Sequence, residues 1–181
     1  MEQFPVFMNL QGQPCLVAGE QNKALAKIEL LLKAGARIDL LTQDPCDRIL
    51  ELLHRNLLNR LKQSPEQIDL TRYRLVIGAS EDQQLNRKLA DQAMSLNIPV
   101  NVVDRPESCT FTVPSIVDRS PLLVAVSSSG QSPTLSKVVR RKIETMLPLS
   151  YGPLAKMIGK YRSEVLKRPG SYTEKKRFWE R

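Results

Sequence analysis

Residues 15–27 read CLVAGEQNKALAK, and this stretch decides the fold class. The apolar run Cys15–Ala18 stops at Gly19, and a helical pattern begins near Ala24, with apolar residues on one face at Leu25, Ile28, Leu31 and Leu32. A strand, a tight turn and a helix in this order form the βα unit of nucleotide-binding sheets. Because Glu20–Asn22 follow the glycine, only one glycine of the G-x-G-x-x-G fingerprint is present. At this point an ordinary βα turn fits the sequence about as well as a dinucleotide-binding turn.

Three further apolar runs follow, separated by stretches long enough for helices. They read RIDLL at residues 37–41, LVIGA at 75–79 and IPVNVV at 98–103, and residues 83–96 carry apolar side chains at helical spacing. Strands that alternate with helices favour a parallel sheet covered on both faces. The sequence therefore predicts an α/β, doubly wound domain up to about residue 105, with a short helix within PCDRILELLHRNL.

The pattern changes in the second half of the chain. Two short strands are predicted, Phe111–Val113 and Leu122–Val126, separated by the stretch PSIVDRSP. The sequence SSSGQSP then predicts a loop. A basic helix is expected over about Thr134–Met146, with Ser132 as its N-cap and Pro133 at its first position.

Charge is distributed unevenly over the 181 residues, which carry a formal net charge of +8. Residues 1–136 hold 14 basic and 15 acidic residues, whereas residues 137–181 hold 13 basic and 4 acidic ones. Such a basic segment favours an anionic partner: a nucleic acid, a membrane surface or an acidic small molecule. A solvated tail is the plainer alternative.

Several classes of protein are disfavoured by the composition. No apolar run approaches the roughly 20 residues that cross a membrane, and the first residues, MEQFPVFMNL, lack the pattern of a signal peptide. Cys15, Cys46 and Cys109 are far apart and form no C-x-x-C pair, which argues against a disulfide framework and a zinc site. We therefore expect a cytoplasmic protein. His54, the only histidine, is predicted to lie on the surface, which leaves no histidine-based triad.

Candidate binding residues gather where the predicted strands end. Gly19 leaves room for a pyrophosphate at the start of a helix, whose N–H groups attract anions. Asp39 has the spacing of a ribose-binding acid but lies within a strand, so Gln43 and Asp44, just past that strand, are better placed. Ser80 follows another strand, at the edge where doubly wound sheets bind ligands.

Asp104 and a serine-rich loop are the candidates for chemistry. Asp104 ends the NVVD run at a strand's carboxyl end, where a carboxylate is suited to act as a general acid or base or to bind a metal; a turn cap is the alternative. Ser127, Ser128, Ser129 and Gly130 form a loop whose N–H and O–H groups suit carboxylates or phosphates. The alternative is a simple connection from strand to helix.

The segments NVVD (101–104) and FTVPSIVDRSPLLVAVSSSGQSP (111–133) resemble the N-terminal module of siroheme synthases, the precorrin-2 dehydrogenase/sirohydrochlorin ferrochelatase family. FPVFMNLQGQPCLVAG, LLLKAGA and KKRFWE are also similar, so the resemblance covers essentially the whole chain. It implies a Rossmann-like NAD-binding domain over residues 1–113, a dimerisation segment over 114–147 and a helical basic C-terminal region over 148–181.

The resemblance implies NAD-dependent oxidation of precorrin-2 to sirohydrochlorin and insertion of Fe²⁺ to give siroheme. It implies a homodimer with an acidic tetrapyrrole substrate and neither nucleic acid nor membrane as partner. Asp104 matches the family's essential carboxylate, a general acid/base and transient ligand of Fe²⁺. Asn22-Lys23 and Gln43-Asp44 match NAD contacts. Ser128 lies in the loop that lines the tetrapyrrole pocket and matches a serine that is phosphorylated in some members.

The turn after Gly19 departs from the family pattern G-G-G-x-V-A-x-x-K. Glu20 and Gln21 replace glycines, and Glu20 places a carboxylate where a pyrophosphate approaches, although Lys23 offsets that charge. Two alternatives to the bifunctional enzyme therefore stay open. One is a chelatase that works without NAD, and the other is a non-catalytic tetrapyrrole-binding protein.

Overall fold

The computed structural model describes residues 1–167, with the backbone alone for 163–167. Residues 168–181, which include the KKRFWE motif and the end of the basic region, lie outside the described residues. The chain divides into two units, Met1–Val113 and Pro114–Arg181, and each is described by itself. The division of the second unit into a dimerisation segment and a helical region stays a prediction.

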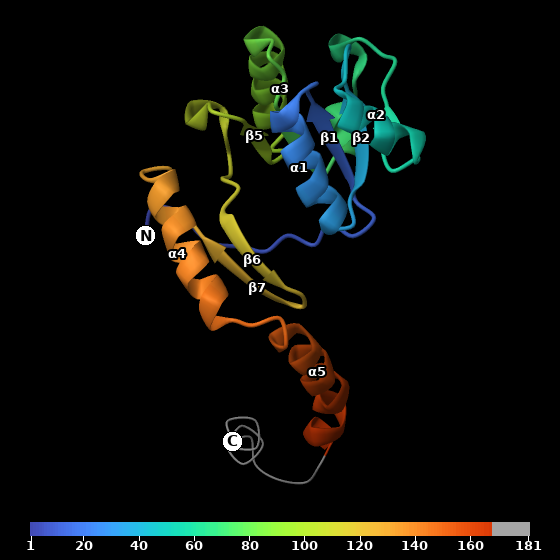
Figure 1. Ribbon diagram of the computed structural model, residues 1–181. Coiled ribbons are helices and arrows are strands. Elements are labelled where there is room, and N and C mark those ends of the chain that lie inside the picture. Colours follow the sequence, from blue (N-terminus) through green and yellow to red (C-terminus); the bar gives the residue numbers. More distant parts are fainter. Residues whose placement is uncertain (168–181) are drawn as a thin grey trace. The chain divides into compact units, whose positions relative to one another are not determined.

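The first unit is built on a five-stranded parallel sheet in the order β3-β2-β1-β4-β5 (Figure 1). Its strands are β1 (Pro14–Ala18), β2 (Arg37–Leu41), β3 (Asn59–Arg60), β4 (Leu75–Gly78) and β5 (Val100–Val102). Its helices are α1 (Asn22–Lys33), α2 (Asp47–His54) and α3 (Gln83–Ser95), with 3-10 turns at Pro65–Gln67, Leu70–Arg72 and Pro106–Ser108. The predicted doubly wound α/β sheet is confirmed. The strand order reverses between β1 and β4, the switch point at which such sheets bind ligands.

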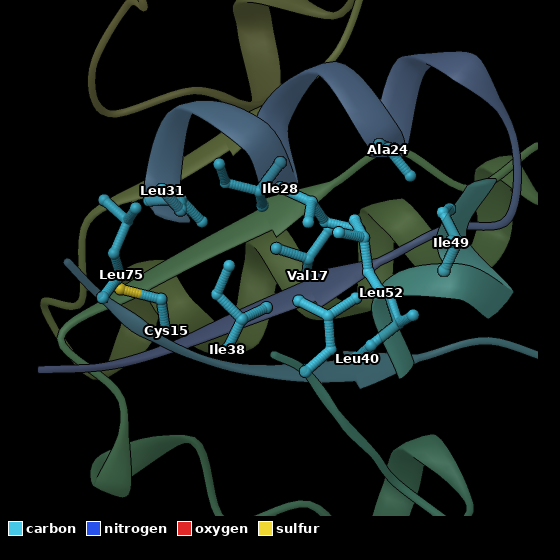
Figure 2. Close-up of a cluster of buried hydrophobic side chains, with 14 of the residues drawn as sticks. Cys15, Val17, Ala24, Ile28, Leu31, Ile38, Leu40, Ile49, Leu52 and Leu75 are labelled. Atoms are coloured by element: carbon cyan, nitrogen blue, oxygen red, sulfur yellow. The ribbon is translucent and has the colours of Figure 1, made fainter. Parts of the chain in front are cut away.

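The central strand β1 is buried on both faces, as a sheet covered on two sides requires. Figure 2 shows Val17 on one face, among Ile28 of α1 and Leu52 of α2. Leu16 points to the opposite face, where it packs with Leu89 and neighbouring residues of α3. Because successive strand residues face opposite layers, the continuous apolar run of β1 fills both halves of the core.

One predicted strand is wrong. Phe111–Val113 is not a strand; the strand is β6 (Ser115–Arg119), which lies inside PSIVDRSP and pairs antiparallel with β7 (Leu122–Val126). Phe111 instead packs against the core of the first unit, and its carbonyl accepts a hydrogen bond from Asn101 Nδ2 at 2.9 Å. The apolar residue therefore anchors the end of the first unit, while the more polar stretch after it forms the hairpin.

The second unit joins this hairpin to α4 (Pro133–Met146) and α5 (Tyr151–Lys167). The predicted cap is confirmed, because Ser132 Oγ accepts a hydrogen bond from the Leu135 N–H at 3.2 Å. Arg119 donates to the Leu147 carbonyl at 2.7 Å and so ties the end of β6 to the C-terminus of α4. Within residues 1–167, no helix has the length and apolar character needed to cross a membrane.

Candidate functional site

A cavity of about 970 Å³ opens at the carboxyl ends of β1, β2 and β4 in the first unit. We call it the carboxyl-edge cavity. Its lining comes from the segments that follow four strands: Glu20 and Gln21 after β1, Leu41–Asp44 at the end of β2, Arg60–Pro65 from β3 onward, and Ser80–Asp82 with Leu85 after β4. This is the edge of a doubly wound sheet at which ligands bind.

The structure separates the predicted cofactor contacts into two sets. Gln43, Asp44 and Ser80 line the carboxyl-edge cavity, whereas Gly19 and the pair Asn22-Lys23 belong to the adjoining turn and are not part of its lining. Asn22 and Lys23 are the first residues of α1, whose N-cap, Gln21, makes no side-chain cap hydrogen bond. The start of this 12-residue helix therefore offers N–H groups and a partial positive charge to an anion.

Gly19 is required by the packing of the sheet itself. Its φ of +150° is unfavourable for residues with a side chain, and an added Cβ would lie 2.6 Å from the Ala79 carbonyl oxygen and 2.9 Å from Ala24 Cβ. Its N–H donates to the Leu41 carbonyl at 3.0 Å. The turn after β1 thus passes tightly over the end of β4, which explains this glycine without a ligand.

Glu20 is held toward the end of β4. The Ser80 hydroxyl lies 3.3 and 3.2 Å from the two Glu20 carboxylate oxygens and donates to that carboxylate, while the Glu20 carbonyl accepts from the Cys46 N–H at 2.9 Å. The Ser80 hydroxyl also accepts from the Asp82 N–H at 3.2 Å. The carboxylate that replaces a glycine is therefore anchored, but it remains part of the cavity lining.

Asp39 makes structural contacts within the sheet. Its two carboxylate oxygens accept hydrogen bonds from the Tyr73 hydroxyl at 2.7 Å and from Asn59 Nδ2 at 2.9 Å. Burial, together with the hydrogen bond to Asp39, raises the pKa of the Tyr73 hydroxyl. The spacing that would make Asp39 a ribose-binding acid is thus explained by a contact between β2, β3 and the segment before β4.

Sequence reasoning missed two groups near the end of β2: Thr42, which follows that strand, and Arg60 of β3. Thr42 is among the residues that line the carboxyl-edge cavity and is only 7% exposed, and its inaccessible hydroxyl oxygen has no hydrogen-bond partner among the described side chains and backbone. Arg60 Nη2 donates to the Gln43 carbonyl at 2.6 Å and approaches that of Thr42 at 3.4 Å. The only signal in the sequence is that Thr42 directly follows an apolar strand.

Asp104 follows β5 with a left-handed φ of +62°. Lys23 Nζ donates to its Oδ2 at 2.6 Å, and both side chains are about two-thirds exposed. One helical turn further along α1, the half-buried Lys27 is near enough for charge interactions: burial lowers its pKa, while Asp104 and Cys109 raise it. A predicted phosphate-binding lysine and the predicted catalytic carboxylate therefore contact each other.

The serine-rich loop of the second unit is organised around the start of α4. Ser128 Oγ accepts from the Ser132 N–H and from Ser136 Oγ, each at 3.0 Å. The Ser129 N–H donates to Ser127 Oγ at 3.1 Å, and Gly130 has a positive φ of 84°. The predicted substrate loop is thus also a helix cap, and the buried Ser136, which sequence reasoning missed, supports it.

No group of three or more His, Cys, Asp or Glu side chains gathers to hold a metal within the described part of the chain. The three cysteines are free, and burial raises the pKa of the Cys15 thiol to about 11, as expected for a core residue. His54 is exposed, as predicted.

Comparisons with known families cover most of the chain. A family described as "Putative NAD(P)-binding" matches residues 6–115, and one described as "Sirohaem biosynthesis protein central" matches residues 119–146. The siroheme synthases of Methylobacillus flagellatus and Vesicomyosocius okutanii are 43% and 39% identical over 180 residues. The alignments cover 99% of this chain but 38% and 39% of those proteins, so the chain spans about two-fifths of their length.

A solved structure, "SirC, precorrin-2 dehydrogenase", is similar with a TM-score of 0.80 and 23% sequence identity. The match covers 97% of this chain and 86% of that one. At this level of identity the likeness supports the fold.

Proposed function

Because the chain belongs to the putative NAD(P)-binding family and adds the central segment of sirohaem biosynthesis proteins, as the siroheme synthase N-terminal module does, we propose that it oxidises precorrin-2 to sirohydrochlorin with NAD and inserts Fe²⁺ to give siroheme. The observation that carries this proposal is the carboxyl-edge cavity at the switch point of the sheet. Gln43, Asp44 and Ser80 line it, as proposed cofactor contacts should.

The residues around the cavity fit a dinucleotide. The N-terminus of α1, with Asn22 and Lys23, would hold the pyrophosphate next to Gly19, and the end of β2 would hold the adenosine. Gln43 and Asp44, which follow β2 and line the cavity, support this fit. When bound, NAD⁺ supplies the acceptor for the hydride that precorrin-2 loses.

Asp104 is the proposed general base and acid. Oxidation of precorrin-2 releases a proton as well as a hydride, and insertion of Fe²⁺ releases two protons from pyrrole nitrogens. The Asp104 carboxylate, which Lys23 Nζ contacts at 2.6 Å, is the group proposed to accept these protons. Its exposure leaves it accessible to a substrate and to Fe²⁺, which enters as a substrate and is bound by Asp104 only transiently.

The second unit is proposed to bind the acidic tetrapyrrole and to dimerise. The hydroxyls and N–H groups of Ser127–Gly130 suit substrate carboxylates, as does the excess of basic residues over 137–181. Ser128 is the proposed phosphorylation site. Exposed apolar side chains on the hairpin and α4, including Ile116, Leu123 and Leu135, support a homodimer through residues 114–147. Three free cysteines favour a reducing cytoplasm.

The test is anaerobic turnover of precorrin-2, followed by absorbance with and without NAD⁺, together with a separate assay of sirohydrochlorin and Fe²⁺. The proposal expects sirohydrochlorin only when NAD⁺ is present, and siroheme once Fe²⁺ is added. Absence of both reactions would contradict it and favour a non-catalytic tetrapyrrole-binding protein.

A chelatase that works without NAD is the second candidate, and Glu20 is the observation that favours it. Its carboxylate lines the cavity near the start of α1, where it repels a pyrophosphate. This candidate expects siroheme from sirohydrochlorin and Fe²⁺ but no oxidation of precorrin-2. It also expects no measurable binding of NAD⁺.

A further inference from the structure

The segment that follows Asp104 supports an inference that rests on the proposed function and deepens it. We propose that residues 109–111, which we call the return segment, position the Asp104 carboxylate for proton transfer through the Cys109 thiol. Asp104 belongs to a tight turn over residues 102–105, the Asp104 turn, which is closed by a backbone hydrogen bond of 3.2 Å between its ends. The φ of +62° at Asp104 is a left-handed conformation, which costs a residue other than glycine about 1–3 kcal/mol and persists only when its surroundings impose it.

The direction of the Asp104 side chain depends on this turn. The side chain is about two-thirds exposed, so packing around it contributes little to its direction. Its hydrogen-bond donor, Lys23, is similarly exposed and carries its charge at the end of a flexible chain. An exposed ion pair of this kind contributes little free energy. The backbone of the Asp104 turn is therefore the part that can hold the carboxylate in one place.

The Cys109 thiol contacts both ends of the Asp104 turn. Its Sγ accepts a hydrogen bond from the Val102 N–H at 3.2 Å. It also lies 3.3 Å from the Val102 carbonyl oxygen and 3.1 Å from that of Arg105, to either of which the S–H can donate. Burial raises the pKa of this thiol, so it keeps the proton that it donates. A thiol makes weak hydrogen bonds, but this one links the first residue of the turn to the last.

The rest of the return segment holds the thiol in place along β5. Within the described residues β5 is an edge strand of the sheet, so its outer side pairs with no other strand. Thr110 closes that side, because its Oγ1 accepts from the Val100 N–H and its own N–H donates to the Val100 carbonyl, each at 2.8 Å. Asn101 Nδ2 donates to the Phe111 carbonyl at 2.9 Å. The return segment thus takes the place of a further strand and fixes where Cys109 meets the turn.

The first measurement tests this contact without any reaction. Amide hydrogen exchange of the full chain, without cofactor or substrate, is followed by NMR. In Cys109→Ala the Val102 and Arg105 N–H groups should exchange roughly two- to tenfold faster, as expected when a weak hydrogen bond is lost, while the Val100 N–H exchanges as in wild type. Thr110→Val is the matched control, because it removes the acceptor of the Val100 N–H and should give the reverse pattern. Unchanged exchange at Val102 and Arg105 in Cys109→Ala overturns the role of the thiol.

The second measurement is steady-state turnover of precorrin-2 with NAD⁺ and of sirohydrochlorin with Fe²⁺. Cys109→Ala should lower kcat in both assays by roughly 10- to 100-fold and change KM by less than about twofold, because a misplaced carboxylate slows proton transfer but leaves binding intact. Cys109→Ser should recover part of the loss, since a hydroxyl also donates and accepts. Cys46→Ala, at another half-buried thiol of the first unit, is the control and should keep kcat at the wild-type value. A serine variant no faster than the alanine variant overturns the hydrogen-bonding role.

A double variant shows whether Cys109 acts through Asp104. If it does, Cys109→Ala causes no further loss of turnover in an Asp104→Asn background, whereas two independent losses multiply. Multiplied losses, or an unchanged kcat in Cys109→Ala, overturn the inference and leave the proposed function standing, because the wild type is still active. Absence of both reactions in the wild type overturns the proposed function and the positioning role together, even where hydrogen exchange shows the contact.

Discussion

The turn after β1 and the end of β2 lie at the same edge of the sheet but differ in where their polar groups find partners. In the turn, Glu20 accepts from Ser80, Lys23 pairs with Asp104, and Gly19 is required by the approach of Ala79. At the end of β2, the Thr42 hydroxyl has no partner among residues 1–167. The turn carries the visible motif, whereas the end of β2 carries the unmet hydrogen bond. The motif residues of the turn therefore have partners within the fold, whereas the Thr42 hydroxyl at the end of β2 has none among the described residues.

The largest expected effect comes from Asp104, which links the turn to the proposed chemistry through Lys23. Asp104→Asn removes the charge but tolerates the left-handed backbone, as alanine would not. We expect turnover of precorrin-2 and of Fe²⁺ to fall by at least about 100-fold, the usual contribution of a general acid or base. NAD⁺ binding should persist or tighten, because Lys23 becomes available to phosphate.

Asp91→Asn, at an exposed acid of α3, is the matched control and should leave both rates unchanged. Full activity of Asp104→Asn in both assays would remove Asp104 from the mechanism. Lost NAD⁺ binding in that variant would instead show that Asp104 contributes to the cofactor site.

Gly19→Ala tests whether the glycine of the turn is structural. The added Cβ would meet the Ala79 carbonyl oxygen at 2.6 Å, in a backbone with a φ of +150°. We therefore expect the free energy of unfolding to fall by about 2–4 kcal/mol. Gly12→Ala is the control, because Gly12 also has a positive φ but no atom within 4 Å of the added Cβ. It should cost only about 1 kcal/mol. If urea unfolding shows that Gly19→Ala and Gly12→Ala lose the same free energy of unfolding, the close approach to Ala79 does not contribute to the stability cost.

Much of the fold is predictable because burial on both faces leaves a clear pattern. The apolar runs of β1, β2 and β4 and the capping residue Ser132 are all visible in the sequence. The strand at Ser115–Arg119 is missed because only two of its five residues, Ile116 and Val117, are apolar, and they are adjacent and show no strand-like alternation. Apolar Phe111, by contrast, is easily mistaken for part of a strand.

The candidate site is less predictable, because its properties depend on contacts between distant segments. The spacing of Asp39 suggests a ribose acid, but the sequence does not show that Tyr73 and Asn59 converge on it. The only signal for Thr42 in the sequence is its place after an apolar strand, since the absence of a partner for its hydroxyl is a property of the folded chain. Residue types near strand ends indicate where a site lies. The hydrogen bonds of the folded chain decide which of these side chains are still available to bind a ligand.

Glu20→Gln tests how far the turn opposes a dinucleotide. The amide still accepts a hydrogen bond from Ser80 but loses the charge that repels a pyrophosphate. We expect NAD⁺ to bind up to about tenfold more tightly, a gain of about 1.4 kcal/mol. Glu29→Gln, at an exposed position of α1, controls for the change in net charge. If both variants gain equally, the effect is one of overall charge and Glu20 has no special place in the site.

The smallest effect concerns Tyr73, whose hydroxyl donates a hydrogen bond to Asp39, the residue with the spacing of a ribose-binding acid. Because the pKa of its hydroxyl is raised in the folded state, the folded chain keeps this proton at a pH where the unfolded chain loses it. The resulting stability is fully present below the ordinary tyrosine pKa of about 10 and is lost as the pH rises toward the higher folded pKa.

Tyr73→Phe should lower the free energy of unfolding by about 1 kcal/mol at neutral pH and flatten the fall in stability between about pH 10 and pH 11. Urea unfolding at a series of pH values measures both, with Tyr161→Phe, at an exposed tyrosine of α5, as control. Asp39 keeps the hydrogen bond from Asn59 in Tyr73→Phe, so a rise in NAD⁺ affinity of this variant would show that the Tyr73 hydroxyl alone withholds Asp39 from the cofactor.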